Sequence, residues 1–245
     1  MNEHDDIWRK AGKAENFLEV VRGGIPLAAE QIDVLLRVVR ASIGGVRKFL
    51  DIGCGDGILA RAILAEHPGS HGLLLDYSPV MVESARGKMS AESGRVRFVV
   101  GDFSSPAWVD AVRDHGPFDL VVSGFAIHHQ PDRRKQRLYE EVFELLEPGG
   151  LFLNLEHVAS KAAIGTGVFE ELFLDSLWAY HRAQGGTKSR DELAEQQAVL
   201  DDSEENLLAP VDQQCAWLGK AGFVEVDCFF KVLELALFGG VKPRV

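Results

Sequence analysis

The sequence has little cysteine and no excess of positive charge, and these two absences exclude several classes of protein. Its three cysteines, Cys54, Cys215 and Cys228, lie far apart and form no CxxC pair. We therefore expect neither a disulfide framework nor a metal site. Acidic residues outnumber basic ones 37 to 26, which gives a formal net charge of −11. Because such a surface repels phosphate backbones and anionic lipids, we expect no nucleic-acid partner and no membrane partner.

Long apolar runs are also missing, since none approaches the roughly 20 residues that span a bilayer. The first residues, 1–13, are polar and charged rather than typical of a secretory signal. Together with the cysteine usage, this predicts a cytoplasmic protein, which we expect to be a monomer or a homodimer. The length of 245 residues suits one α/β domain with an appended lid.

Short apolar segments alternate with segments of helical periodicity over the first two thirds of the chain. The expected strands cover residues 46–52, 71–76, 95–100, 118–123 and 151–155. Nearly all their residues are apolar, which is typical of parallel strands covered by helices on both faces. The pattern predicts a Rossmann-like α/β fold with three layers, helix, sheet and helix.

Local signals place the ends of several helices in this pattern. Ser78 followed by Pro79 predicts an N-cap and a first helical residue. In the same way, Ser105-Pro106 is expected to open a helix. The Pro148-Gly149-Gly150 segment is expected to end the helix before the fifth strand.

Four segments follow from these patterns. We expect an N-terminal helical cap (1–45), a core (46–159), a helical lid insertion (160–209), and a helix with two strands that completes the sheet (210–245). The insertion is rich in Glu, Gln and Ala, with interspersed aromatic residues. The last two expected strands, 223–231 and 233–242, are joined too tightly for a helical crossover and should be antiparallel.

The most informative motif is DIGCGDG at residues 51–57, between the first expected strand and a helix. Its glycines let the backbone turn sharply and approach a ligand. The dinucleotide-binding fingerprint has its third glycine one position later, where this chain has Ile58. Asp51 would repel a pyrophosphate and better suits a cationic group. A nicotinamide-dependent oxidoreductase is therefore the less favoured alternative.

Acidic and aromatic residues follow the neighbouring strands. Asp76 can accept hydrogen bonds from ribose hydroxyls, and Asp102 beside Phe103 suits an adenine. Asp102 alternatively caps the helix that follows it. Ligands of open α/β sheets bind where the strand order reverses, at the carboxyl ends of the strands. The predicted cofactor-binding residues are Asp51, Gly53, Cys54, Gly55, Asp76, Tyr77, Met81, Gly101, Asp102, Phe103, Ser123, Gly124 and Phe125.

The motifs DIGCGDG, LLLDYS, GDF and LEPGG, within residues 47–156, resemble those of the class I S-adenosylmethionine (SAM)-dependent methyltransferase family. The resemblance implies that SAM is the cofactor and that the sheet has seven strands, the last antiparallel. It also implies that Asp51 lies near the methionine moiety, Asp76 binds the ribose, and Asp102 and Phe103 line the adenine pocket. The acidic balance and the lid favour a small-molecule methyl acceptor, which the sequence does not identify.

The order of parts outside the core more loosely resembles carboxy-SAM synthases, which modify SAM rather than transfer its methyl group. An Ile/Val-Pro step before the core and a KAGF segment before the final strands are shared features. The arginine associated with the carboxylated cofactor in that group would fall at Trp217 here. This departure favours ordinary SAM, with the synthase as the alternative.

Three histidines are candidate catalytic residues. His128 and His129 follow the fourth strand, and His157 follows Glu156 at the end of the fifth. A histidine at the carboxyl end of a strand can take a proton near neutral pH. Because adjacent residues point in different directions, we do not expect His128 and His129 to share a metal ion.

Overall fold

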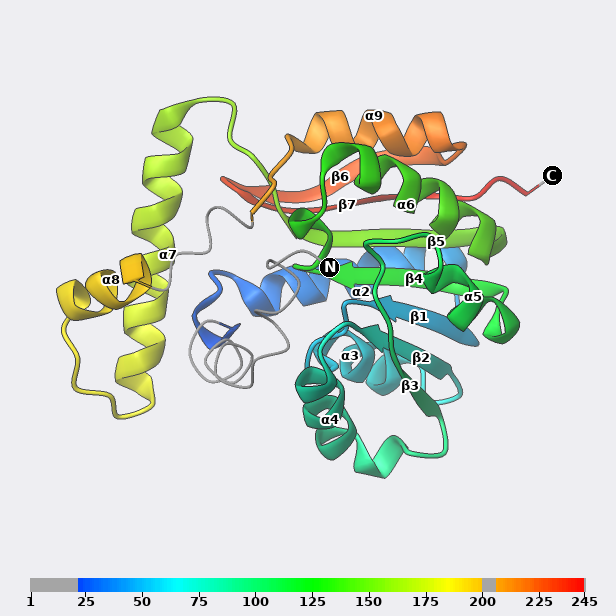
Figure 1. The fold of residues 1–245 in the computed structure, drawn as a ribbon, viewed down its shortest axis with the longest axis horizontal. Helices are drawn as coiled ribbons and strands as arrows, with labels where there is room; N and C mark the ends of the chain where they lie inside the picture. Colours follow the sequence, from blue (N-terminus) through cyan, green and yellow to red (C-terminus); the bar gives the residue numbers. More distant parts are fainter. Residues whose placement is uncertain (1–21, 200–205, 245) are drawn as a thin grey trace.

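The computed structural model describes residues 22–199 and 206–244, and its centre is one seven-stranded sheet (Figure 1). The strand order across the sheet is β3-β2-β1-β4-β5-β7-β6. The strands are β1 (Lys48–Ile52), β2 (His71–Asp76), β3 (Val96–Val100), β4 (Phe118–Gly124), β5 (Leu146–His157), β6 (Val224–Val232) and β7 (Leu235–Val241).

The pairing confirms the predicted sheet. Strand β1 pairs in parallel with β2 and β4, and β4 pairs in parallel with β5. Strand β7 is antiparallel to both β5 and β6. The chain moves outward from β1 to β3 and then returns to β4 on the other side of β1. The strand order therefore reverses between β1 and β4, where a ligand crevice is expected.

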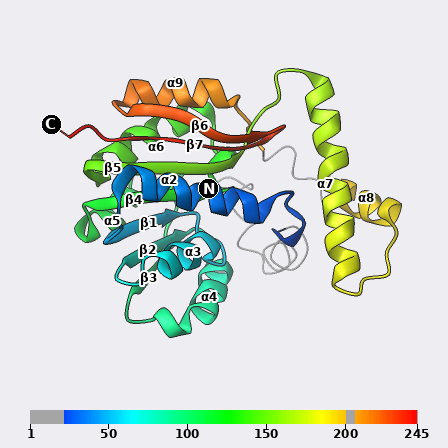
Figure 2. The same ribbon diagram turned by 180° about the vertical axis from the view of Figure 1, so that it is seen from behind.

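Helices cover both faces of the sheet, as predicted. One face carries α2 (Ala28–Ile43), α3 (Ile58–Glu66) and α4 (Pro79–Lys88), which stand in front in Figure 2. The other carries α5 (Trp108–Val112), α6 (Asp132–Leu145) and α9 (Val211–Ala221). Short 3-10 helices are η3 (Arg22–Gly24), η4 (Ser90–Glu92), η5 (Arg113–His115) and η6 (Ile127–His129).

Alternate residues of the central strands pack into two separate cores. In β1, Leu50 and Ile52 join the cluster under α5, α6 and α9, whereas Phe49 joins the cluster under α2 and α3. In β4, Val121 packs in the first of these clusters and Val122 in the second. This period of two follows from the pleat, which points successive side chains to opposite faces. Burial on both faces explains why the sequence pattern of these strands is continuously apolar.

Two boundaries differ from the sequence prediction by more than two residues. Helix α4 does begin after Ser78, whose hydroxyl accepts a hydrogen bond from the Met81 amide. Helix α5, however, begins at Trp108 rather than at Ser105-Pro106, because the Ser105 hydroxyl accepts from the Ala107 amide within a turn.

The second difference lies at the start of β5. Helix α6 ends at Leu145 and the strand begins at Leu146, so Pro148-Gly149-Gly150 lies inside β5 instead of ending the helix. Leu146 pairs with Phe118 of β4, and Gly149 donates its amide to the Lys242 carbonyl.

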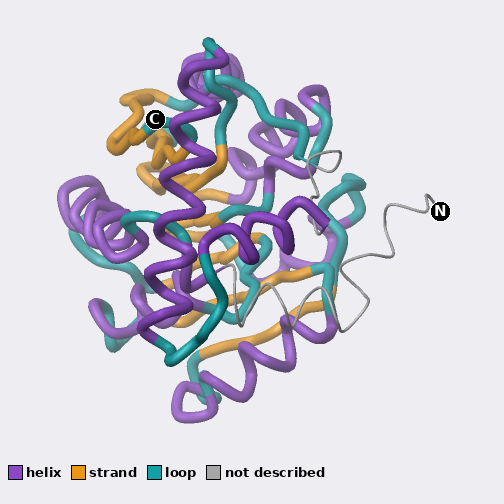
Figure 3. Tube along the Cα trace, turned by 90° about the vertical axis from the view of Figure 1, so that its left-hand side faces the viewer, coloured by secondary structure: helices purple, strands orange, loops and turns teal. Residues whose placement is uncertain are grey.

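The insertion after β5 is helical, with α7 (Ala163–Ala183) and α8 (Arg190–Val199). Helix α7 stands across the edge where the parallel strands end (Figures 1 and 3). It packs against η3, where a Cβ added to Gly23 would lie 2.1 Å from the Tyr180 ring. The insertion and the segment before α2 therefore meet beside the carboxyl ends of the strands. Across residues 22–199 and 206–244, no helix is long and apolar enough to span a bilayer.

Candidate functional site

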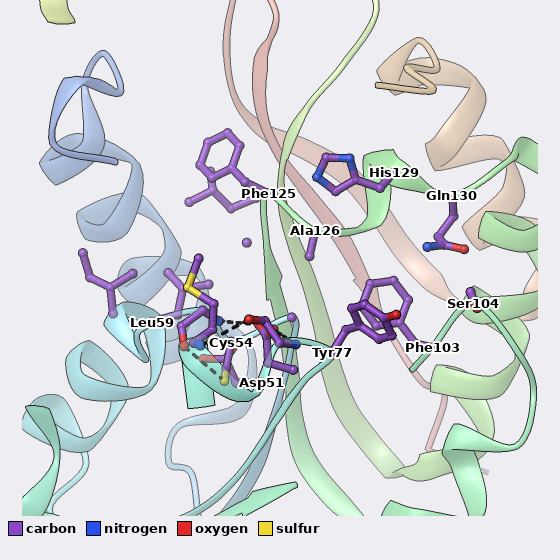
Figure 4. Close-up of a pocket in the computed structure, with 18 of the residues that line it drawn as sticks. Asp51, Cys54, Leu59, Tyr77, Phe103, Ser104, Phe125, Ala126, His129 and Gln130 are labelled. Carbon is purple, nitrogen blue, oxygen red and sulfur yellow. Dashed lines mark hydrogen bonds between the residues drawn. The ribbon is translucent and has the colours of Figure 1, made fainter. Parts of the chain in front are cut away.

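A cavity of about 680 Å³ opens at the carboxyl ends of β1, β2 and β4, where the strand order reverses (Figure 4). This volume lies in the range usual for cofactor and small-molecule sites. The wall includes Asp51, Gly53, Cys54, Gly55, Asp76, Tyr77, Met81, Asp102, Phe103, Gly124 and Phe125. The fold thus brings together all but two of the residues predicted to bind the cofactor.

The two exceptions are Gly101 and Ser123, which do not line the cavity. Ser123 is fully buried, and its hydroxyl donates to the Ile52 carbonyl at 2.8 Å, which ties β4 to β1. A Cβ added to Gly101 would lie 3.0 Å from Leu75. Both residues therefore contact the protein interior rather than the cavity.

The glycine-rich turn is held against β2 by its own backbone. The amides of Gly53 and Cys54 both donate to the Leu75 carbonyl, at 2.8 and 3.0 Å. Gly53 has φ +66°, and a Cβ there would lie 2.2 Å from that of Ala126. Only glycine fits this position, because both the left-handed backbone and the close approach exclude a side chain.

Asp76 lies at the tip of β2 and is fixed by two backbone amides. Its Oδ2 accepts from the Gly55 amide and its Oδ1 from the Ser78 amide, each at 2.8 Å. These two bonds orient the carboxylate, which also lines the cavity. Asp51 contributes a second acidic side chain, which is 1% exposed and lines the same cavity.

Asp102 and Phe103 form a third part of the wall. The Asp102 carboxylate accepts from both the amide and the hydroxyl of Ser104, at 2.8 and 2.7 Å. Asp102 therefore stabilises the loop before α5 and does not cap that helix, which corrects the alternative drawn from the sequence. The Nε of Arg134 donates to the Phe103 carbonyl at 2.8 Å, and its guanidinium binds Glu141.

Phe125 directly follows β4 and has a strained conformation. Its φ is +52°, which is unusual for a bulky side chain. The Phe125 amide donates to the Leu155 carbonyl at 2.8 Å, which holds this geometry. In Figure 4, Phe125 and His129 lie above the glycine-rich turn, on the opposite side of the cavity from Asp51 and Cys54.

Among the three candidate histidines, only His129 lines the cavity. His128 lies behind it and is buried, with the two ring centroids 4.0 Å apart. The His128 Nδ1 lies 2.5 Å from Glu156 Oε1, and the His128 amide donates to Glu156 Oε2. The two adjacent rings thus contact each other, although only one of them faces the cavity.

The His157 amide also donates to Glu156 Oε1, at 2.9 Å, but the His157 ring contacts a second carboxylate, near α7. Its Nε2 lies 2.9 Å from Glu234 Oε2, and the Thr166 hydroxyl of α7 donates to Glu234 Oε1 at 2.7 Å. Burial by itself would raise the pKa of Glu234. Hydrogen bonds from His157, Thr166 and Ser160 outweigh that effect and lower the pKa to about 2. His157 therefore links β5 to the insertion instead of facing the cavity.

The sequence predicted an N-terminal helical cap and a lid, but it named no wall residue from either segment. Residues 25–32 contribute Ile25, Ala28, Gln31 and Ile32, and the end of the insertion contributes Leu207. No glycine or charge pattern marks these residues. The amphipathic periodicity of α2 was the only available signal, and it indicates a buried face without showing that the face borders a cavity.

Comparisons with known proteins agree with this geometry. A family profile described as a methyltransferase domain matches residues 49–150. A carboxy-S-adenosyl-L-methionine synthase from Chromohalobacter salexigens is 25% identical over 90% of this chain and 77% of its own length. A demethylmenaquinone methyltransferase from Leptospira interrogans is 32% identical over 50% of this chain and 47% of its own length.

The fold also matches solved structures. Human N-acetylserotonin methyltransferase in complex with SAM superposes with a TM-score of 0.63 at 18% identity. The match covers 98% of this chain and 59% of the human one, so this chain spans about three-fifths of that protein. Residues 49–150 thus match a methyltransferase domain, and the order of the strands and the curated relatives agree with the resemblance to the class I SAM-dependent methyltransferase family.

Proposed function

We propose that this chain transfers the methyl group of SAM to a small-molecule acceptor. The observation that carries the proposal is the chemistry of one cavity. We call the glycine-rich turn with the acids Asp51, Asp76 and Asp102 the lower wall, and the mostly apolar lining that carries Gln31 and His129 the upper wall. Figure 4 shows Asp51 below Phe125 and His129. Carboxylates repel a diphosphate but suit an amine-bearing nucleoside, so the residues present fit SAM.

The lower wall binds the cofactor in this proposal. Asp76 accepts from the ribose hydroxyls, Asp102 and Phe103 hold the adenine, and Asp51 faces the methionine moiety. Gly53 and Gly55 contribute backbone and no side chain to this part of the wall. Ser78 and Met81, at the start of α4, complete this part of the wall.

The upper wall aligns the acceptor and receives its proton. When bound, SAM supplies an activated methyl group, and the protein's task is to align the nucleophile and exclude water. A ring nitrogen of His129 takes the proton of the acceptor, because His129 is the candidate base that lines the cavity. His128, held by Glu156 at 2.5 Å, packs against the His129 ring and positions it.

Helices α7 and α8 form a lid in this proposal, within the segment 160–209. Helix α7 crosses the end of the sheet (Figure 3) and packs on η3, just before the wall residues Ile25 and Ala28, which supports water exclusion from that side. The acidic composition favours a small acceptor over nucleic acid. The three free thiols support a reducing compartment such as the cytoplasm.

A carboxy-SAM synthase is the second candidate, because several such enzymes match 90–98% of this chain. The presence of Trp217 in place of the synthase arginine does not discriminate between a methyltransferase and a synthase. Trp217 is buried in the core under α9 and does not line the cavity. Whether the cavity suits SAM or carboxy-SAM depends instead on the charges of its wall.

Calorimetric titration with S-adenosylhomocysteine, the demethylated product, tests the cofactor assignment. We expect a dissociation constant in the micromolar range, and no binding below about 1 mM would contradict the proposal. Turnover is then tested by screening phenols, amines and thiols with methyl-labelled SAM.

His129→Gln should lower turnover of the best acceptor by about 100- to 10,000-fold, as expected for loss of a general base. The affinity for S-adenosylhomocysteine should change less than about threefold. The matched control is His71→Gln, an exposed histidine at the opposite end of β2. Full activity of the His129 variant would remove this residue from the mechanism.

A further inference from the structure

Gln31 is the polar residue that α2 contributes to the cavity wall, and its side chain is fully buried. Its Nε2 donates to the Pro26 carbonyl at 2.6 Å, across the first turn of the helix. The backbone between them bends sharply, because Leu27 has φ +57° and its carbonyl accepts from the Gln31 amide. The side-chain amide is therefore held by its own helix.

This contact fixes which end of the amide faces Pro26. A carbonyl oxygen only accepts hydrogen bonds, so the nitrogen of Gln31 must lie toward the Pro26 carbonyl and the oxygen away from it. Within residues 22–199 and 206–244, Gln31 Oε1 has no hydrogen-bond partner, although it is buried. A buried acceptor without a donor is unfavourable, and such atoms in native structures commonly mark a site for water or ligand.

The surroundings of Gln31 define what such a ligand can be. Neighbouring parts of the wall are apolar, with Ile25, Ala28 and Ile32 before and on α2, and Phe125 and Leu155 beyond. Arg134, the arginine among the described lining residues, already binds the Glu141 carboxylate through two nitrogens. An anionic ligand would find no uncompensated cation here, and burying an unpaired charge is costly.

We propose that Gln31 is a specificity-determining residue whose Oε1 accepts a hydrogen bond from an uncharged acceptor that carries a hydroxyl or N–H group on an apolar, flat body. This inference rests on the proposed function, because it assigns the upper wall to the methyl acceptor. It also names the class of acceptor: a neutral molecule with a hydrogen-bond donor. A carboxylate or phosphate is excluded.

Two probes with the same ring system, one with a hydroxyl donor and one with that hydroxyl methylated, test the proposal. In protein saturated with S-adenosylhomocysteine, 2-naphthol should bind roughly 3- to 10-fold more tightly than 2-methoxynaphthalene, the range expected for one hydrogen bond. In Gln31→Leu this ratio should fall to about 1. In Gln31→Glu at acidic pH, the protonated carboxyl group can donate to the Pro26 carbonyl and keep one acceptor oxygen, so the preference for 2-naphthol should persist. The control is Gln136→Leu, since Gln136 is an exposed glutamine of α6 that does not line the cavity.

The outcomes separate this inference from the proposed function. Equal affinities for the two probes in the unmodified protein, binding of neither probe, or an unchanged ratio in Gln31→Leu would overturn the role of Gln31. Titration of each variant with S-adenosylhomocysteine shows that it is folded and keeps the cofactor site. If S-adenosylhomocysteine does not bind the unmodified protein, the cofactor assignment is wrong. The role of Gln31 is then tested by the ratio of the two probe affinities, measured without S-adenosylhomocysteine.

Discussion

Asp76 both fixes the glycine-rich turn and faces the cavity, through oxygens that accept from Gly55 and Ser78. Asp76→Asn keeps the shape of the side chain but replaces one acceptor oxygen with a donor nitrogen. We expect the affinity for S-adenosylhomocysteine to fall at least about 10-fold, because hydrogen bonds to a charged group contribute roughly 1.5–3 kcal/mol. Calorimetry measures the affinity, with Asp110→Asn, on the exposed face of α5, as the control. Unchanged affinity would refute the ribose assignment.

Gly53 gives a second prediction at this scale. Gly53→Ala places a methyl group 2.2 Å from the Ala126 Cβ and forces a left-handed backbone on alanine. The expected loss of stability is about 2–4 kcal/mol, from backbone strain and overpacking together. Thermal unfolding measures it. Gly69→Ala is the matched control, because a Cβ there meets no atom within 4 Å. Equal unfolding temperatures for the two variants would show that the turn relaxes without cost.

At the scale of elements, the sequence predicts the order and type of the secondary structure but not every boundary. Short, continuously apolar segments between helical segments predict β1, β2 and β4. Ser78-Pro79 predicts the start of α4. The start of β5 depends on pairing of Gly149 and Gly150 with Lys242, nearly a hundred residues away. Local patterns contain no information about such a partner, so Pro-Gly-Gly indicates a turn until the pairing is known.

The link between α7 and the final hairpin predicts a dependence on acid. The pKa of Glu234 is lowered from its usual 4.5 to about 2, so the folded state favours the ionised form. The contribution of Glu234 to the free energy of unfolding is fully present above about pH 4.5 and is lost as the pH falls toward 2. Its maximum is about 3 kcal/mol. Glu234→Gln should therefore flatten the fall in unfolding temperature over this interval.

The same variant should increase hydrogen exchange in the first turns of α7, since Thr166 loses its carboxylate partner. Glu83→Gln is the control, because Glu83 is exposed on α4 and forms only a long contact with Arg86. Identical acid profiles for the Glu234 variant and the unmodified protein would show that this contact does not hold α7 in place.

For the whole molecule, topology explains which part of the site is predictable. Asp51, Asp76 and Asp102 lie at the ends of neighbouring parallel strands, so the expected sheet order alone brings them together. The position of Gln31 depends on how α2 packs across the sheet, and the burial of His128 depends on the carboxylate of Glu156. Neither contact has a signature in the local sequence.

The charges of the whole cavity also predict which cofactor the protein carries. A carboxylated sulfonium adds a negative charge that needs a free cation. Arg134 is the arginine among the described lining residues, and the Glu141 carboxylate already compensates it. Mass spectrometry of the nucleoside released from purified protein should therefore detect SAM or S-adenosylhomocysteine, and the Asp76→Asn variant should release less of it. Recovery of carboxy-SAM would favour the synthase, and it would require a cation that the described wall does not provide.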